Sequence, residues 1–266
     1  MGTDSQTYAQ LARWKATPPA KAEVLSHSYF NNNLDINAGC SFLIAVEEFV
    51  PKGATVIDMG CGSGYIAIKL YDMGYKTEGV DISEEMLAIF KQQAGTRDIS
   101  YRLSDIFNMP IEKLYDAITI RYVFTHYQDY VSLLTAVARH VKQGGYLFFD
   151  SMTSESFDEY RKFSGRQDIG KSVKAHAPYP FSDADLRSSC TNLGLSVVCR
   201  RPVHFFYSNP FLYAMLESVD DYLEELRDQI SKEEVFKFVR WFESSIHKHW
   251  PLDFCGHTMN VIRKVS

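Results

Sequence analysis

The chain has 266 residues, a length that allows a full hydrophobic core and favours one domain with elaborations over two equal domains. Its 28 basic and 33 acidic residues give a formal net charge of −5. This balance lacks the positive field on which nonspecific nucleic-acid binding depends, so it disfavours a nucleic-acid partner.

The N-terminal part of the chain predicts helices ahead of any strand. Helical patterns at residues 8–14 and 20–29 lie on either side of Pro18 and Pro19, and residues 37–49 form a third pattern. The N-terminal residues 1–10 are polar, and no stretch approaches the ~20 apolar residues that a membrane-spanning helix needs. We therefore expect a cytoplasmic protein without a membrane partner.

From residue 55 onward, short apolar runs alternate with helical patterns. The strand-like runs cover residues 55–58, 76–80, 99–103, 117–120 and 146–149, and the helical patterns cover 64–73, 83–93 and 130–141. Ser83 is the expected N-cap of the second helix, while Gly144 and Gly145 are expected to end the third helix and lead into the fifth strand. Such alternation is typical of a parallel sheet with helices packed against it.

The region after residue 150 predicts a cover and the last two strands. Residues 151–180 show only a weak pattern, a helix starts near 181–185, and residues 195–206 and 258–265 are strand-like. Two amphipathic helices are expected between these strands. We therefore expect an α/β fold with a Rossmann-like, seven-stranded, mostly parallel sheet whose last strand is antiparallel. The single domain would have its core at about 37–206 and 255–266, and cover elements at 1–36, 151–180 and 207–254.

A glycine motif follows the first predicted strand and opens the next helix. It consists of Asp58, Gly60, Gly62 and Gly64. Glycines at such a turn let the backbone bend tightly and let its N–H groups approach a ligand closely. A dinucleotide-binding fold has the same strand and turn, but it requires its third small residue at position 65, where this chain has Tyr65. The motif therefore favours S-adenosylmethionine over a nicotinamide cofactor.

Two further acidic residues follow the next two predicted strands. Asp81 comes 21 residues after Gly60, and its carboxylate can accept hydrogen bonds from both ribose hydroxyls of either cofactor. Asp105 follows the third strand, where it can accept the adenine amino group while Ile106 packs against the ring. Because a dinucleotide site does not need Asp105, this residue separates the two cofactors better than Asp81 does.

These motifs resemble those of the class I S-adenosylmethionine-dependent methyltransferases, in particular the small-molecule branch that includes ubiquinone-biosynthesis methyltransferases. The resemblance covers about residues 40–206 and the last strand. It implies that Asp58 and the glycine loop bind the methionine part of the cofactor, Asp81 the ribose, and Asp105 and Ile106 the adenine. The expected cofactor-binding residues are Asp58, Gly60, Cys61, Gly62, Gly64, Tyr65, Asp81, Ile82, Met86, Asp105, Ile106, Arg121, Tyr122 and Tyr29.

The loop after the fourth predicted strand departs from the family pattern. Arg121 stands where relatives usually have Asn or Ser beside the methionine part. Tyr29 lies in the N-terminal region from which several relatives close a tyrosine over the cofactor; the alternative is a tyrosine that packs between helices. No metal ion is expected, because the histidines and cysteine near the C-terminus (His247, His249, His257 and Cys255) lack the paired spacing of a zinc site.

Three residues of the same loop are candidates for catalytic roles. His126 is the best candidate for a general base, because histidine titrates near neutral pH and this position follows the fourth strand. The alternative is a structural histidine at a helix start. Tyr122 and Tyr127 either contact the acceptor or belong to the core.

The expected activity is methyl transfer from S-adenosylmethionine to a nitrogen or oxygen of a small, aromatic or partly apolar metabolite, with S-adenosylhomocysteine as the product. Aromatic residues are frequent between residues 205 and 250, which favours an enclosed pocket for a flat methyl acceptor. The alternatives are a protein or RNA methyltransferase, a noncatalytic S-adenosylmethionine-binding protein of the same fold, and a nicotinamide oxidoreductase. The absence of a basic stripe in the sequence argues against a macromolecular acceptor.

Overall fold

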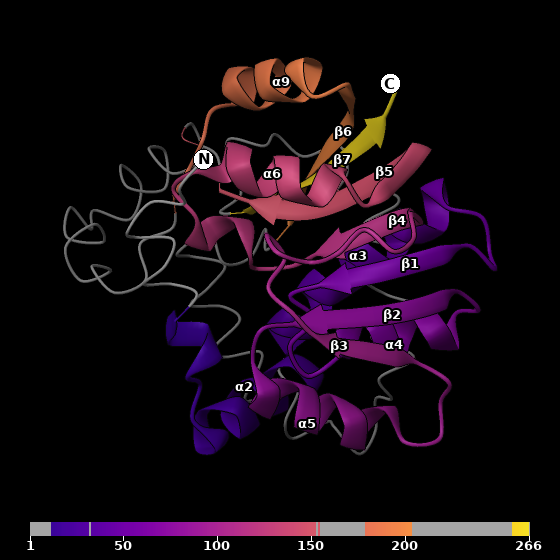
Figure 1. Ribbon diagram of the computed structural model, residues 1–266, viewed down its shortest axis with the longest axis vertical. Coiled ribbons are helices and arrows are strands. Elements are labelled where there is room, and N and C mark those ends of the chain that lie inside the picture. The colour runs from indigo at the N-terminus through magenta and orange to yellow at the C-terminus, as the bar shows by residue number, and fades with distance from the viewer. Residues whose placement is uncertain (1–11, 32, 153, 155–178, 204–256, 266) are drawn as a thin grey trace.

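A seven-stranded sheet forms the centre of the computed structural model, which describes residues 12–31, 33–152, 154, 179–203 and 257–265 (Figure 1). The strand order is β3-β2-β1-β4-β5-β7-β6, and only β7 runs antiparallel to its neighbours. The predicted sheet is therefore confirmed, including its antiparallel last strand. The strands are β1 (Thr55–Met59), β2 (Lys76–Asp81), β3 (Ser100–Leu103), β4 (Tyr115–Ile120), β5 (Val141–Ser151), β6 (Leu195–Val203) and β7 (His257–Lys264).

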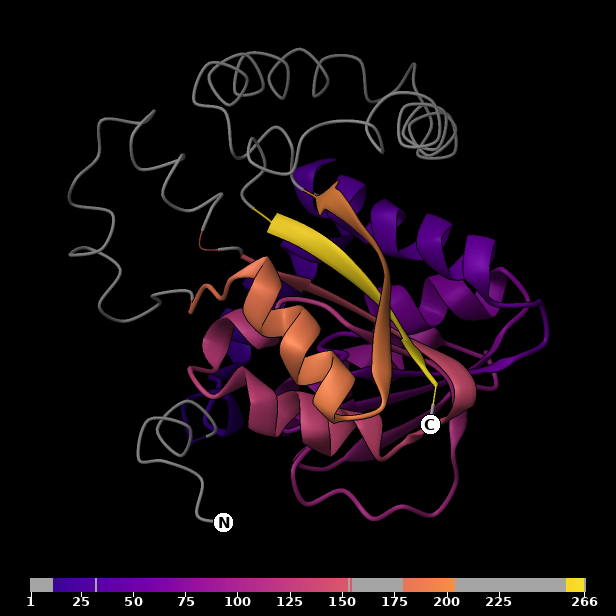
Figure 2. The same ribbon diagram turned by 90° about the horizontal axis from the view of Figure 1, so that it is seen from above.

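Helices cover both faces of this sheet. In Figure 2, α3 lies on one face, and α6 and α9 lie together on the other. Figure 1 shows α5 near the end of the sheet formed by β3 and β2. The helices are α2 (Pro19–Asn31), α3 (Asn33–Phe49), α4 (Tyr65–Asp72), α5 (Glu84–Ala94), the 3₁₀-helix η1 (Phe124–His126), α6 (Tyr130–Ala138) and α9 (Asp183–Asn192).

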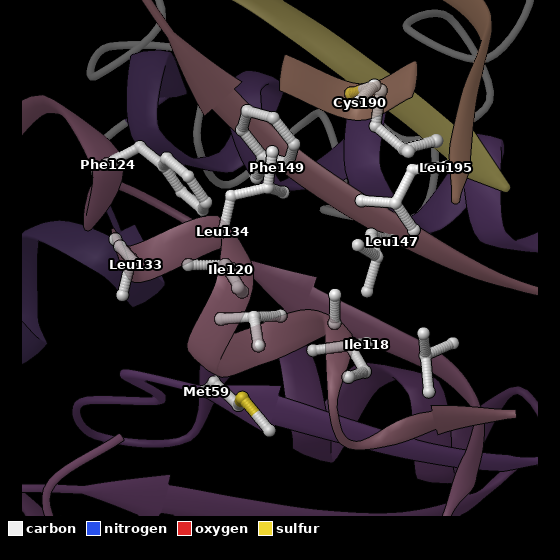
Figure 3. Packing of buried hydrophobic residues seen from close by; sticks show 14 of the residues in the cluster. Met59, Ile118, Ile120, Phe124, Leu133, Leu134, Leu147, Phe149, Cys190 and Leu195 are labelled. Atoms are coloured by element: carbon white, nitrogen blue, oxygen red, sulfur yellow. The ribbon is translucent and has the colours of Figure 1, made fainter. Parts of the chain in front are cut away.

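The two faces of the sheet bury separate hydrophobic clusters, because side chains alternate along each strand. On β5, Leu147 and Phe149 join the cluster beneath α6 and α9, whereas Phe148 joins the cluster beneath α3 and α4. Figure 3 shows the first cluster, in which the ring of Phe124 stacks on that of Phe149 with 4.0 Å between their centroids. This packing anchors η1, and with it the loop that follows β4, to the rigid sheet.

The start of α5 confirms the prediction that Ser83 is the N-cap of this helix. The Ser83 hydroxyl accepts a hydrogen bond from the Met86 amide at 3.3 Å, and Glu84 and Glu85 occupy the first turn. A serine at this position satisfies one of the amides that a helix start leaves without an intrahelical partner. This cap fixes the direction in which the chain leaves β2.

The predicted boundary between the third helix and the fifth strand was wrong. The helix, α6, ends at Ala138, and β5 begins at Val141 instead of after the glycines. Gly144 and Gly145 lie within β5, where the pairing register with β4 shifts between Tyr115 and Ala117. Gly144 has a φ of 78°, so the two glycines make an irregularity inside the strand rather than a turn before it.

The described residues leave the predicted cover untested. The segments 155–178 and 204–256 lie outside them. These segments include most of the weakly patterned region and the sequence for which the aromatic pocket and the two amphipathic helices are predicted. Within the described part of the chain, no helix is both long enough and apolar enough to cross a membrane.

Candidate active site

The glycine loop, residues 60–64, connects β1 to α4. It lies close to β2 and to the loop that follows β4. The amides of Gly60 and Cys61 both donate to the Val80 carbonyl of β2, at 2.8 and 3.0 Å. Gly60 has a φ of 74°, and a Cβ added to it would lie 2.5 Å from Cγ2 of Val123. Only glycine combines this backbone conformation with so close an approach to the loop that follows β4.

Asp81, at the end of β2, holds the glycine loop in place. Its Oδ2 accepts a hydrogen bond from the Gly62 amide at 2.7 Å, and its Oδ1 accepts one from the Ser83 amide at 2.9 Å. Burial raises the pKa of this carboxyl group, while the amides of Ser83 and Gly62 act in the opposite direction. Each carboxylate oxygen has a second lone pair, so the group retains acceptor capacity for a ligand.

Asp58, in β1, is a buried carboxyl group beside the same loop. Its side chain is only 3% exposed, and its Oδ1 accepts a hydrogen bond from the Thr119 hydroxyl at 2.8 Å. Burial raises the pKa of Asp58 to about 7, although the hydrogen bond from Thr119 and the positive charge of Arg121 oppose this shift. The charge of this site therefore changes near neutral pH.

Asp105 follows β3 and forms a local turn. Its Oδ1 accepts a hydrogen bond from the Phe107 amide at 2.9 Å, and its Oδ2 accepts one from Nδ2 of Asn108, also at 2.9 Å. These bonds fix the orientation of the carboxyl group. Asp105 also lines a cavity to which Asp58 and Asp81 contribute.

The loop after β4 brings a cation and aromatic rings to the site. The Arg121 guanidinium carbon lies 4.7 Å from the centroid of the Tyr122 ring, and the Arg121 side chain is buried. His126, at the end of η1, has its ring centroid 5.3 Å from that of Trp14, which lies far away in the sequence. Tyr127 is buried, and burial, together with the charges of Asp105 and Asp81, raises its pKa, so its hydroxyl stays protonated at neutral pH.

A single cavity joins these groups at the carboxyl ends of the parallel strands, where ligands bind in open α/β sheets. It encloses about 960 Å³ of empty space, including the part open to solvent. Among its lining residues are almost all of the predicted site residues: Asp58, Gly60, Cys61, Gly62, Tyr65, Asp81, Ile82, Met86, Asp105, Ile106, Arg121, Tyr122, His126 and Tyr127. The structure thus brings together side chains from four strand ends and a distant N-terminal segment.

Two predicted residues are not among those lining the cavity. Gly64 lies at the start of α4, where a Cβ would come within 2.2 Å of the Phe90 ring, so this glycine serves packing. Tyr29 belongs to α2, but its side chain lies outside the described residues. The roles expected of His247, His249, His257 and Cys255 also concern side chains outside this part of the chain.

Four lining residues were not predicted: Trp14, Ile66, Ser104 and Val123. Ser104 and Val123 adjoin predicted site residues, so their strand-end positions were a usable signal. Ile66 lies one position beyond Tyr65 in α4. Trp14 had no local signal, because only the folded chain brings it against His126.

Comparisons with known proteins find methyltransferases. Residues 57–149 match the family described as "Methyltransferase domain". The malonyl-[acyl-carrier protein] O-methyltransferase of Bacillus cytotoxicus is 26% identical over 168 residues, which cover 59% of this chain and 59% of that protein. The ubiquinone biosynthesis O-methyltransferase of Paracidovorax citrulli is 32% identical over 106 residues, covering 38% of this chain and 44% of that protein. The matched part is thus about half the length of these curated relatives.

Solved structures show the same fold. The magnesium protoporphyrin IX methyltransferase from Synechocystis PCC 6803, solved with bound S-adenosylmethionine, has a TM-score of 0.55 and 17% sequence identity, covering 76% of this chain and 91% of that chain. The sheet order, the glycine loop after β1 and the family match point to the same group of proteins. Residues 57–149 thus match a methyltransferase domain, and the described part of the chain has the fold of class I S-adenosylmethionine-dependent methyltransferases.

Proposed function

We propose that the protein transfers a methyl group from S-adenosylmethionine to a nitrogen or oxygen atom of a small, aromatic or partly apolar molecule. The observation that carries the proposal is the single cavity in which Asp81, the glycine loop and Asp105 meet the loop after β4. The names of the two curated relatives, both O-methyltransferases, support the same reaction class.

The chemistry of the lining residues fits S-adenosylmethionine. Asp81 would accept hydrogen bonds from the ribose hydroxyls, and Asp105 would accept one from the adenine amino group, because both carboxyl groups are held in place by amide donors and retain lone pairs. Ile82, Met86 and Ile106 supply apolar surface for the adenosine part. The bound cofactor supplies a methyl group on a positively charged sulfur.

The methionine part would lie between β1 and the loop after β4. Asp58 would hold the ammonium group, and Gly60 to Gly62 would place backbone next to it. Burial raises the pKa of the Cys61 thiol, as do the charges of Asp81 and Asp58, so this cysteine stays a thiol in the lining and is not a nucleophile.

The remaining lining residues would orient the methyl acceptor. Trp14, Tyr122 and Tyr127 present aromatic side chains, and methyl transfer depends mainly on aligning the acceptor with the methyl group. His126 would take the proton of an acceptor that arrives protonated, because its ring is partly exposed and lines the cavity.

The test is to incubate the purified protein with S-adenosylmethionine labelled in its methyl group and with a metabolite extract, and to identify labelled products by mass spectrometry. The proposal predicts label in a metabolite of low molecular mass. Label found only in added protein or RNA would replace the small acceptor with a macromolecule. Saturable binding without transfer to any acceptor would instead indicate a noncatalytic binding protein.

A further inference from the structure

Tyr122 has a backbone conformation that is unfavourable for a residue with a side chain. Among the residues that the structure describes, it alone combines a side chain with a positive φ, of 57°. For residues other than glycine, this left-handed conformation is about tenfold less favourable in equilibrium terms. Non-glycine residues keep it only where the surrounding structure holds them, often at functional sites. Tyr122 lines the proposed methyl-transfer cavity.

Asp150 accepts a hydrogen bond from the backbone of Tyr122. Its Oδ1 accepts a hydrogen bond from the Tyr122 amide at 2.7 Å, which is short for a bond between nitrogen and oxygen. Asp150 is fully buried near the end of β5, where it pairs with Met259 of β7, while the preceding residue, Phe149, pairs with Ile120 of β4. The acceptor oxygen is thus carried by a central strand with partners on both sides.

The conformation of Tyr122 decides where its two neighbours lie. The guanidinium of Arg121 packs over the Tyr122 ring, and Cγ2 of Val123 lies against the Cα of Gly60. All three residues of this loop line the cavity, whereas Asp150 does not. A change in the backbone at Tyr122 would therefore move one wall of the cavity relative to the glycine loop.

We infer that Asp150 is a positioning residue: by holding the Tyr122 amide, it keeps Arg121, Tyr122 and Val123 against the glycine loop where cofactor and acceptor meet. The inference rests on the proposed function, since it assigns Asp150 to the same site. In this role Asp150 acts through the backbone of Tyr122, because Asp150 itself is not among the residues that line the cavity.

A double-mutant cycle tests this coupling. The variants are Asp150→Ala, Tyr122→Gly and the double variant, and the measurement is the dissociation constant of S-adenosylhomocysteine by calorimetry. We expect Asp150→Ala to weaken binding about tenfold in the wild-type background and less than about twofold in the Tyr122→Gly background, because glycine adopts the left-handed conformation without help. Asp150→Asn should weaken binding less than Asp150→Ala, since its amide oxygen can accept the same hydrogen bond.

Equal weakening in both backgrounds, or no weakening by Asp150→Ala, would overturn the inference. The same cycle measured on the equilibrium constant for unfolding should show a coupling of about tenfold, and it remains measurable if a variant no longer binds ligand. Wild-type protein that binds no S-adenosylhomocysteine would contradict the proposed function, while the unfolding cycle would still decide the role of Asp150.

Asp116 provides a control elsewhere in the sheet. It also lies in the sheet and accepts a hydrogen bond from a backbone amide, that of Thr55 at 2.8 Å, but it is near the start of β4 and does not line the cavity. Asp116→Ala should lower stability without any coupling to Tyr122→Gly. Coupling of the same size for Asp116 would show that the cycle reports general loosening of the sheet, and would overturn the assignment of Asp150.

Discussion

The carboxyl group of Asp81 connects the glycine loop to the start of α5, since its two oxygens accept hydrogen bonds from Gly62 and Ser83. Asp81→Ala should weaken S-adenosylmethionine binding by about 10- to 100-fold, because hydrogen bonds to a charged acceptor are lost and the loop loses its support. Titration calorimetry measures the dissociation constant of S-adenosylmethionine for each variant. Asp72→Ala, which removes an exposed ion pair with Arg97, is the control and should leave affinity unchanged. Unchanged affinity in the Asp81 variant would mean that the ribose binds elsewhere.

His126 has two competing roles that substitutions can separate. If His126 is the base, both His126→Ala and His126→Gln should lower the turnover number about 10²-fold, with the affinity for the cofactor little altered. If His126 only packs against the Trp14 ring, His126→Gln should retain more turnover than His126→Ala. Steady-state kinetics with the acceptor found by methyl labelling distinguishes these outcomes. A normal rate in the Gln variant would leave His126 with the structural role alone.

Asp58 should make stability depend on pH. Its pKa is about 7 in the folded protein, against an ordinary value of 3.8 that applies to the unfolded chain. Because the folded protein binds the proton more tightly, the contribution of Asp58 to stability is fully present below about pH 4 and is lost as the pH rises through 7. Asp58→Asn carries no charge at any of these pH values. The variant should therefore gain stability relative to wild type as the pH rises from 5 to 8, measured by urea unfolding at each pH. A difference that stays constant over this range would contradict the raised pKa of Asp58.

At the scale of elements, the turn between β1 and α4 depends on a glycine for packing as well as for its backbone. Gly64 has a φ of 87° and lies against the Phe90 ring of α5, whereas Gly74, with a φ of 92°, would place a Cβ in open space. Gly74→Ala should cost roughly 1 kcal/mol for its backbone alone. Gly64→Ala should cost at least about 1 kcal/mol more, because the added carbon also displaces the ring. Guanidinium unfolding compares the two variants, and equal losses would refute the packing argument.

Elements with strong local signals were predictable from the sequence. Short strand-like runs that alternate with helical patterns located β1, β2 and β4, and Ser83 followed by two glutamates marked the start of α5. The boundary at β5 was not predictable, because Gly144 and Gly145 are compatible with either a turn or an irregular strand. Pairing with β4 decided between these alternatives, and pairing is a property of the folded sheet.

The part of the site that lies at strand ends was predictable from the sequence. Asp58, Asp81 and Asp105 each lie within two residues of the carboxyl end of a strand, so parallel pairing alone brings them to one edge of the sheet. The left-handed conformation of Tyr122 carried no sequence signal, because non-glycine residues rarely adopt it. The contact between Trp14 and His126 depends on the path of the N-terminal segment, which no local pattern describes.

At the scale of the whole molecule, the sheet order explains why one cavity collects residues from so much of the chain. The chain leaves β1 toward β2 and β3 on one side and returns to β4 on the other, so the loops on both sides of β1 meet above it. The glycine loop, Asp81, Asp105 and the loop after β4 share this edge, and helices cover both faces of the sheet beneath it (Figures 1 and 2). The fold thus leaves this edge of the sheet for a ligand.

The proposed function requires this cavity to bind S-adenosylmethionine. The most direct measurement is a calorimetric titration of the purified chain with S-adenosylmethionine, and in parallel with NAD. We expect saturable binding of one S-adenosylmethionine molecule per chain and no binding of NAD, because Tyr65 stands where a dinucleotide site needs a small residue. Absence of S-adenosylmethionine binding, or saturable binding of NAD in its place, would show that the cavity is not an S-adenosylmethionine site.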